Sequence, residues 1–478
     1  MINRLNFSSI SRLWTERKFV LLWIRGLIVF GVILLSMMLA RRASTSLVLA
    51  TFGLVVGIFA VNMLMKWPHL GLVGLVIASM LLPLSIGTGT NTSINAAILI
   101  TGLLAGLWIM EIVVRKRQVD LVPSRTTLPL IAFVIVCFLA FINGQIQWFV
   151  FARAAPLLAQ VGGLGLFIVS VSAFLLAANW IKQIVWLERI TWLFVILGSV
   201  YLVGRLMPPR GWSLRDLFQY GSDASMFWIW LVAIALSQVI FNSKIRYYWR
   251  IVLGVVVAIA VYVSFVQFKD WKSGWLPAFT AMFVIIWLGA PRFRVWLILF
   301  GLVGVAIYFT GIQQVLVGDE EYSLLTRVAS SRILLEIIKV NPILGLGPAN
   351  YYYYTPLYSI LGYSVRFNSH NNYIDIVAQI GLLGLICFVW FIWELGISGW
   401  RLLPKAPDGF ARAYVIGALG GLAGTLVAGM LGDWIIPFVY NVGLVGFRSS
   451  VYGWLFLGGM VALGDILRRS GQLNDNIT

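Results

Sequence analysis

One histidine of this chain lies where a polar stretch meets an apolar helix. Residues 317–371 are the one long polar stretch in a sequence otherwise built of apolar segments, and His370 stands near its end. A lone histidine in a protein is more often structural than catalytic. At this boundary, however, the imidazole has an ordinary pKa near working pH and can take a proton from a hydroxyl group. His370 is therefore the candidate general base.

No metal ligands accompany this histidine in the sequence. The chain has one other histidine, no acidic cluster surrounds His370, and Cys137 and Cys387 both lie in apolar stretches. Such cysteines are expected to be buried free thiols, and a metal site needs several ligands close together. We expect no metal site and no cofactor.

Two arginines precede His370 on a predicted helix that begins at Arg327. On such a helix Arg332 lies one turn from Glu336 and can pair with it, whereas Arg327 points to a face that carries no acid. Arg327 is therefore the freer guanidinium for an anionic ligand. The helix should lie along the membrane interface and end at Pro342.

A glycine pair and a run of tyrosines follow this helix. Gly345-Leu346-Gly347 permits a tight turn. No strand precedes the glycines and no Lys-Ser/Thr pair follows them, which argues against a nucleotide-binding loop. Tyrosines 351–354 either anchor the loop at the membrane interface or stack on a sugar ring or an isoprenoid.

The composition is that of a polytopic membrane protein. Of the 478 residues 60% are hydrophobic and 11% are charged, and the mean hydropathy is +0.93. The 21 tryptophans and 17 tyrosines suit two interfacial belts. The net charge of +18 fits Lys and Arg kept on the cytoplasmic side, because no soluble basic domain exists to bind nucleic acid. The expected surroundings are a lipid bilayer.

Apolar windows predict an all-α protein with about 12–14 transmembrane helices in one integral membrane domain, residues 1–478. The windows are 19–40, 45–65, 68–87, 94–114, 127–143, 157–179, 183–204, 224–242, 251–267, 275–290, 295–316, 373–394, 411–432 and 448–467.

The distribution of Lys and Arg predicts the orientation. With the N-terminus in the cytoplasm, alternating loops place most cations inside, so both termini are predicted to be cytoplasmic and loop 317–371 extracytoplasmic. Most of the remaining cations lie in three outer loops, 205–222, 268–274 and 317–371. Either an anionic ligand retains them there, or acids such as Asp216 pair with them.

Several of these features together resemble the O-antigen ligase and polymerase superfamily. The features are Arg327, Pro342, Gly345-x-Gly347-x-x-Asn350, His370-Asn371-x-Tyr373 and Gly381-Leu-Leu-Gly384. Elsewhere the resemblance is one of general layout, with many helices and one long outer loop late in the chain. At the position of Ser331 the family often has Trp. Arg332 is therefore an alternative to Arg327 as the counterpart of the family's arginine.

The resemblance implies a bacterial inner-membrane glycosyltransferase of surface polysaccharide biosynthesis. Its donor would be a glycan on polyprenyl diphosphate, and its acceptor a hydroxyl of another glycan or lipid, with no metal ion. His370 would be the base, and Arg327 and Arg215 would hold the diphosphate. The remaining implied substrate-binding residues are Arg210, Arg332, Lys272, Asn371 and Tyr373. Lys272 stands where an arginine is common and lacks the bidentate fork of that residue.

Two other classes remain as alternatives. A transporter or flippase for lipid-linked oligosaccharides would favour charged or broken helices at mid-membrane and matching halves. The sequence offers Arg25 and Glu188 as candidate charges and no matching halves. Another lipid-linked glycosyltransferase fold would need a carboxylate in the first outer loop, and residues 41–45 contain none. Enzyme residues should converge at the outer surface, and transporter residues at the midplane.

Overall fold

The computed structural model describes residues 57, 59, 61–87, 93–117, 121–207, 213–307 and 319–471. The chain divides into two units, Met1–Trp67 and Pro68–Thr478. In the first unit residues 61–66 are helical. The predicted span 19–40, most of the span 45–65 and Arg210 lie outside the described residues. Everything below concerns the second unit.

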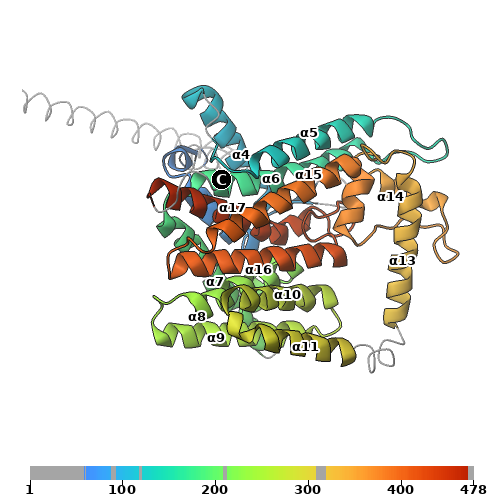
Figure 1. The fold of residues 1–478 in the computed structure, drawn as a ribbon. Coiled ribbons are helices and arrows are strands. Elements are labelled where there is room, and N and C mark those ends of the chain that lie inside the picture. Colours follow the sequence, from blue (N-terminus) through green and yellow to red (C-terminus); the bar gives the residue numbers. More distant parts are fainter. Residues whose placement is uncertain are drawn as a thin grey trace, which may run out of the picture. The chain divides into compact units, whose positions relative to one another are not determined.

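Helices make up nearly all of this unit (Figure 1). Within the described ranges, eight helical segments are long and apolar enough to cross a membrane. They are α4 (Ala96–Met110) continued by η1 (Glu111–Lys116), α6 (Leu157–Trp180), α7 (Ile184–Leu206), α9 (Tyr247–Tyr262) continued by η4 (Val263–Gln267), α10 (Lys272–Gly289), α15 (Asn372–Leu402), α16 (Phe410–Leu431) and α17 (Phe447–Arg469) preceded by η8 (Leu444–Gly446). The predicted all-α polytopic membrane fold is confirmed.

The other elements are shorter. Three apolar helices are α3 (His69–Met80), α5 (Thr127–Asn143) and α8 (Ser225–Phe241). The rest are α11 (Arg294–Ile307), α13 (Asp319–Ile338), α14 (Tyr351–Tyr354), η2 (Leu214–Leu217), η3 (Tyr220–Ser222), η5 (Pro291–Phe293) and η7 (Thr355–Leu357). Strands β1 (Ser85–Gly87) and β2 (Ser93–Asn95) form an antiparallel hairpin in which Ser85 pairs with Asn95.

One predicted span is wrong in its last third. The window 68–87 predicts a single helix, but α3 ends at Met80 and Ser85–Gly87 is a strand. Pro83 explains the difference, because the residue before a proline is pushed out of the helical region. From residue 94 onward, every predicted span overlaps a helix.

The core forms around α17, which is buried along most of its length and packs on α6, α8 and α16. Arg448, in its first turn, is 3% exposed. Its guanidinium donates to the carbonyls of Ala78, Leu82 and Leu84 at 2.9, 2.8 and 3.0 Å, and so satisfies the end of α3. This cation of the predicted outer face is retained by a helix end.

Several helix ends meet at one end of the unit. The hydroxyl of Ser225, at the start of α8, donates to the carbonyl of Ser273 at the start of α10 (2.5 Å). The amide of Asn372, which begins α15, donates to the carbonyl of Ile436 beyond α16 (2.7 Å). Helix α13 runs crosswise to α15 and α16 (Figure 1) and packs on α15. The described parts of the three loops predicted to carry the outer cations lead directly into α8, α10 and α15, and so lie at this end.

Candidate active site

His370 occupies a tight turn directly before α15. Its φ of 49° lies in the left-handed region, which few residues other than glycine adopt. Ser369 holds the turn, since its hydroxyl donates to Asp375 (2.7 Å) and accepts from the backbone N–H of Asn371 (2.9 Å). Asn371 caps α15, because its side-chain oxygen accepts from the N–H of Tyr373 at 2.9 Å. These bonds hold the backbone turn that carries His370.

The guanidinium of Arg327 lies near this imidazole. Burial lowers the pKa of His370 from its ordinary 6.5, and the positive charge of Arg327 lowers it further. Arg327 is half-buried on α13 and donates to the backbone carbonyl of Leu431 at 3.1 Å. The structure therefore brings two predicted residues together, a neutral imidazole and a fixed positive charge.

Two other predicted residues bond to the protein itself. The amide of Asn371 donates to the carbonyl of Met430 at 3.3 Å, and the hydroxyl of Tyr373 donates to the carbonyl of Leu426 at 2.8 Å. These acceptors, like that of Arg327, belong to the last two turns of α16. Asn371 and Tyr373 therefore bind the segment around His370 to the end of α16. The guanidinium of Arg327 contacts the same end of α16.

The sequence analysis missed two residues of this corner, Asp433 and Asn441. Nδ2 of Asn441 lies 3.4 Å from Nδ1 of His370 and also donates to the carboxylate of Asp433. Asp433 is 1% exposed, and its Oδ2 accepts from the N–H of Phe438 at 2.7 Å. Burial raises the pKa of Asp433. The signal available in the sequence was a carboxylate placed directly after an apolar helix.

A second buried carboxyl, Asp375, lies close to Asp433. The hydroxyl groups of Tyr351 and Ser369 both donate to Oδ1 of Asp375. Among the described residues, Oδ2 of Asp375 has no hydrogen-bond partner. Asp375 and Asp433 interact electrostatically, and two buried carboxyls resist carrying two charges at once.

The glycine loop is locked into a break in α15. Gly381, with a φ of 71°, interrupts this helix, and a Cβ there would come within 2.0 Å of the Ile343 carbonyl oxygen. Residues 342–347 supply the backbone partners that the break leaves open. The N–H of Leu346 donates to the carbonyl of Ala378 at 2.9 Å. In the opposite direction, the N–H of Leu382 donates to the carbonyl of Pro342 at 2.8 Å. The Gly-x-Gly pattern therefore serves loop anchoring.

Asn350 and the tyrosines continue this anchoring. The buried amide of Asn350 donates to the carbonyl of Gly144 at 2.9 Å and accepts from the N–H of Ala155 at 2.9 Å. Tyr351 and Tyr354 are buried in the hydrophobic core. Half of the tyrosine run thus packs inside the protein.

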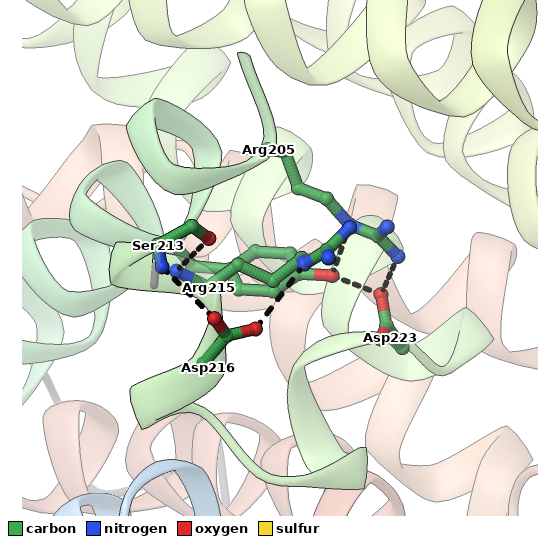
Figure 2. A network of polar contacts seen from close by, with 6 residues as sticks. Arg205, Ser213, Arg215, Asp216 and Asp223 are labelled. Atoms are coloured by element: carbon green, nitrogen blue, oxygen red, sulfur yellow. Dashed lines mark hydrogen bonds and ion pairs between the residues drawn. The ribbon is translucent and has the colours of Figure 1, made fainter. Parts of the chain in front are cut away.

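A second polar cluster lies at the end of α7 (Figure 2). Arg205 donates to the carboxylate of Asp223 and, at 2.7 Å, to the hydroxyl of Tyr201. Its guanidinium also lies 4.7 Å from the ring centre of Phe268. Arg205 is therefore paired within the protein.

Arg215 is held more loosely in the same cluster (Figure 2). It lies on η2, which packs so closely on α7 that a Cβ at Gly204 would come within 2.3 Å of the backbone nitrogen of Arg215. Ser213 accepts from that N–H at 3.1 Å. The guanidinium of Arg215 lies 3.6 Å from Asp216, and its side chain is 43% exposed. Arg215 is therefore accessible to a ligand.

Aromatic rings connect the two clusters. The ring centres of Phe268 and Trp271 are 6.2 Å apart, and those of Trp271 and Trp434 are 5.7 Å apart. Phe268 lies against Arg205, and Trp434 directly follows Asp433. Among the described residues no direct contact joins Arg215 to His370. Phe268, Trp271 and Trp434 thus form an aromatic wall that runs from Arg205 to the segment that begins at Asp433.

The remaining predicted residues lie outside these clusters. Arg332 is exposed on α13, and Glu336, its predicted partner, pairs instead with Lys339 at 2.6 Å. Lys272 is exposed at the start of α10. Within the described part of the chain, no three His, Cys, Asp or Glu side chains gather into a group that could hold a metal ion.

Comparison with known protein families gives a match for the region that holds Arg327 and His370. Residues 271–389 match the O-antigen ligase family. This match supports a place for the chain in the O-antigen ligase superfamily. The resemblance predicted from the sequence is confirmed for the region that holds Arg327 and His370. No curated protein matches the chain.

The family match and the eight apolar helices of the described residues together support a multi-pass membrane protein with a glycan-transferring, glycosyltransferase-like function. Lipid-linked glycan and acceptor substrates follow from the family as classes. Arg215, Asp433 and Asn441 lie outside the matched residues. Their roles therefore rest on the geometry alone.

Proposed function

We propose that this O-antigen ligase superfamily protein transfers a glycan from polyprenyl diphosphate to an acceptor hydroxyl on the extracytoplasmic side of the bacterial inner membrane. The acceptor is a second glycan or a lipid-borne sugar. One observation carries the proposal: the imidazole of His370 and the half-buried guanidinium of Arg327 lie near one another at the end of α16, and both residues belong to the matched family region.

His370 accepts the proton of the acceptor hydroxyl as its oxygen attacks the anomeric carbon. The bond between that carbon and the diphosphate oxygen breaks, and its electron pair leaves with the diphosphate. Attack from the opposite face inverts the anomeric centre. The lowered pKa of His370 keeps the ring neutral and ready to accept the proton.

The leaving diphosphate gains negative charge as the bond breaks, and positive groups already in place stabilise that charge without reorganising. Arg327 is such a group, since α13 and the Leu431 carbonyl hold its guanidinium near His370. Arg215 is the second, because its side chain is accessible and only loosely paired. The aromatic wall between the clusters offers a surface for the sugar or the isoprenoid.

A transporter or flippase is the second candidate, and the break in α15 is the observation that favours it. However, residues 342–347 bond the backbone groups at this break, so the break is filled by the protein itself. The polar side chains described above gather at helix ends. This arrangement supports the transferase over the transporter.

The test uses purified protein in lipid nanodiscs with undecaprenyl diphosphate carrying a short glycan, in the presence of EDTA. The release of undecaprenyl diphosphate is measured with a second lipid-linked glycan or a lipid A core as acceptor. His370→Ala should lower the rate about 10²–10⁴-fold. Equal rates for the variant and the wild type would refute the base, and loss of wild-type activity with EDTA would refute metal independence.

A further inference from the structure

The tautomer of His370 decides whether it can work as a base. Nε2 can accept a proton only when the ring proton sits on Nδ1, and the group that faces Nδ1 fixes this choice. The group facing Nδ1 in this structure is the amide of Asn441, 3.4 Å away. Asn441 is therefore the described side chain that contacts Nδ1.

The amide of Asn441 has one donating end and one accepting end, and both ends fit the same space. Asn441 contacts His370 and Asp433 through the same terminal atom. If that atom is nitrogen, it donates to both partners, and the proton of His370 sits on Nε2. If the amide turns over, its oxygen accepts from both partners, and the proton of His370 sits on Nδ1.

We propose that Asp433, acting through Asn441, selects the ring nitrogen of His370 that carries the proton. This inference rests on the base role in the proposed function. Asp433 and Asn441 are positioning residues, because they act through the histidine.

The protonation state of Asp433 determines which end of the amide it binds. An ionised carboxylate can only accept, so it holds the nitrogen of Asn441 toward itself and toward His370. A protonated carboxyl donates through Oδ1 to the oxygen of Asn441, while Oδ2 still accepts from the N–H of Phe438 at 2.7 Å. Only the second arrangement leaves Nε2 of His370 free to accept a proton.

The surroundings act on the pKa of Asp433 in both directions: burial, the largest effect, raises it, and hydrogen bonds from Phe438, Asn441 and Val442 lower it. Asp433 also lies close to the buried Asp375. The groups that face this corner are Arg327 from α13, Tyr351 from α14 and Asp375 from α15. Of these, Arg327 acts on His370 directly, by favouring a neutral ring.

The rate of transfer should fall at low pH and at high pH for two separate reasons. At low pH, activity falls as His370 becomes protonated, below its ordinary pKa of 6.5 because that pKa is lowered. At high pH, activity falls as Asp433 ionises and Asn441 turns its nitrogen toward His370. Removing the ionisation of Asp433 should therefore remove the alkaline fall alone.

Asp433→Asn provides that test because its orientation is fixed. The N–H of Phe438 keeps an oxygen on its side, so the new amide presents its NH₂ group to Asn441 and imitates the protonated acid. We expect this variant to keep activity within about 10-fold of wild type and to lose the alkaline fall. Asn441→Leu, which breaks the link, should lower kcat about 10–100-fold with little change in KM.

The tautomer can also be read directly, since the chain contains two histidines. In a His69→Asn background, ¹⁵N-histidine solid-state NMR reports on His370 alone. We expect the Nδ1–H form in Asp433→Asn at every pH at which the ring is neutral, and a change to Nε2–H with rising pH when Asp433 is intact. Asn441→Leu should show one tautomer at every such pH.

Identical tautomers and identical pH profiles in the three proteins would overturn the inference. Loss of all activity in Asp433→Asn, with the tautomer unchanged, would also overturn it, since the carboxylate would then act in another way. Full activity of His370→Ala would instead refute the base role. The NMR result does not depend on activity, so the two failures can be distinguished.

Discussion

At the residue scale, sequence spacing pointed to His370 and Arg327, which the structure places near one another, but not to Asp433 and Asn441 beside them. His370 and Arg327 stand out because each is a polar group in a polar segment. Asn441 reaches His370, and Asp433 reaches Asn441, because α15 and α16 return the chain to the same end. A carboxylate after an apolar helix is visible in the sequence, but this long-range contact is not. The predicted pair of Arg332 and Glu336 failed because Lys339 is closer to that acid.

Arg327 should set the acid limb of the pH profile. Its charge lowers the pKa of His370, so Arg327→Met should raise that pKa and move the acid limb toward neutral pH. It should also slow transfer at the optimum, because a charge on the diphosphate loses its partner. Lys339→Met is the matched control, an exposed cation of the same segment that pairs with Glu336. An acid limb that does not move in Arg327→Met would separate Arg327 from the imidazole.

At the element scale, the glycine motifs that resemble the family pack against one another in the structure. The glycine pair and the Gly-Leu-Leu-Gly segment look like separate signals in the sequence. In the structure, loop 342–347 fills the break at Gly381. Sequence periodicity predicts the helix around Gly381 but not the break, because a single residue of positive φ barely changes an apolar window.

The contact between loop 342–347 and the break at Gly381 predicts a large effect of a small substitution. Gly381→Ala adds a Cβ where the Ile343 carbonyl oxygen is 2.0 Å away and forces an alanine to a φ of 71°. Strain of this kind costs about 1–3 kcal/mol before any shift of the loop. We expect a lower melting temperature in detergent and slower transfer. Gly396→Ala on the same helix, where nothing lies within 4 Å, should melt at or above the wild-type temperature. Equal melting temperatures of the two variants would show that the contact between loop 342–347 and Gly381 does not stabilise the fold.

At the scale of the whole molecule, hydropathy was sufficient to find the helices. From residue 94 onward each predicted span overlaps a helix, because about 20 apolar residues are needed to cross a bilayer and leave a plain signal. The spans do not reveal how their ends meet. Contacts such as those of Ser225 with Ser273 and of Asn372 with Ile436 are single polar bonds between distant segments, and they gather the loops around the site.

The sidedness of this end is the last prediction. Positive loops predict that the segment before His370 faces outward and that the loop after α15 faces the cytoplasm. In a protein whose Cys137 and Cys387 are changed to alanine, a membrane-impermeant maleimide added to whole cells made permeable in their outer membrane should label Val365→Cys. It should label Lys405→Cys only after the inner membrane is opened. Both positions are exposed, so access alone decides the result. Labelling of Lys405→Cys in intact cells, with Val365→Cys protected, would place His370 on the cytoplasmic side and remove the lipid-linked donor from its reach.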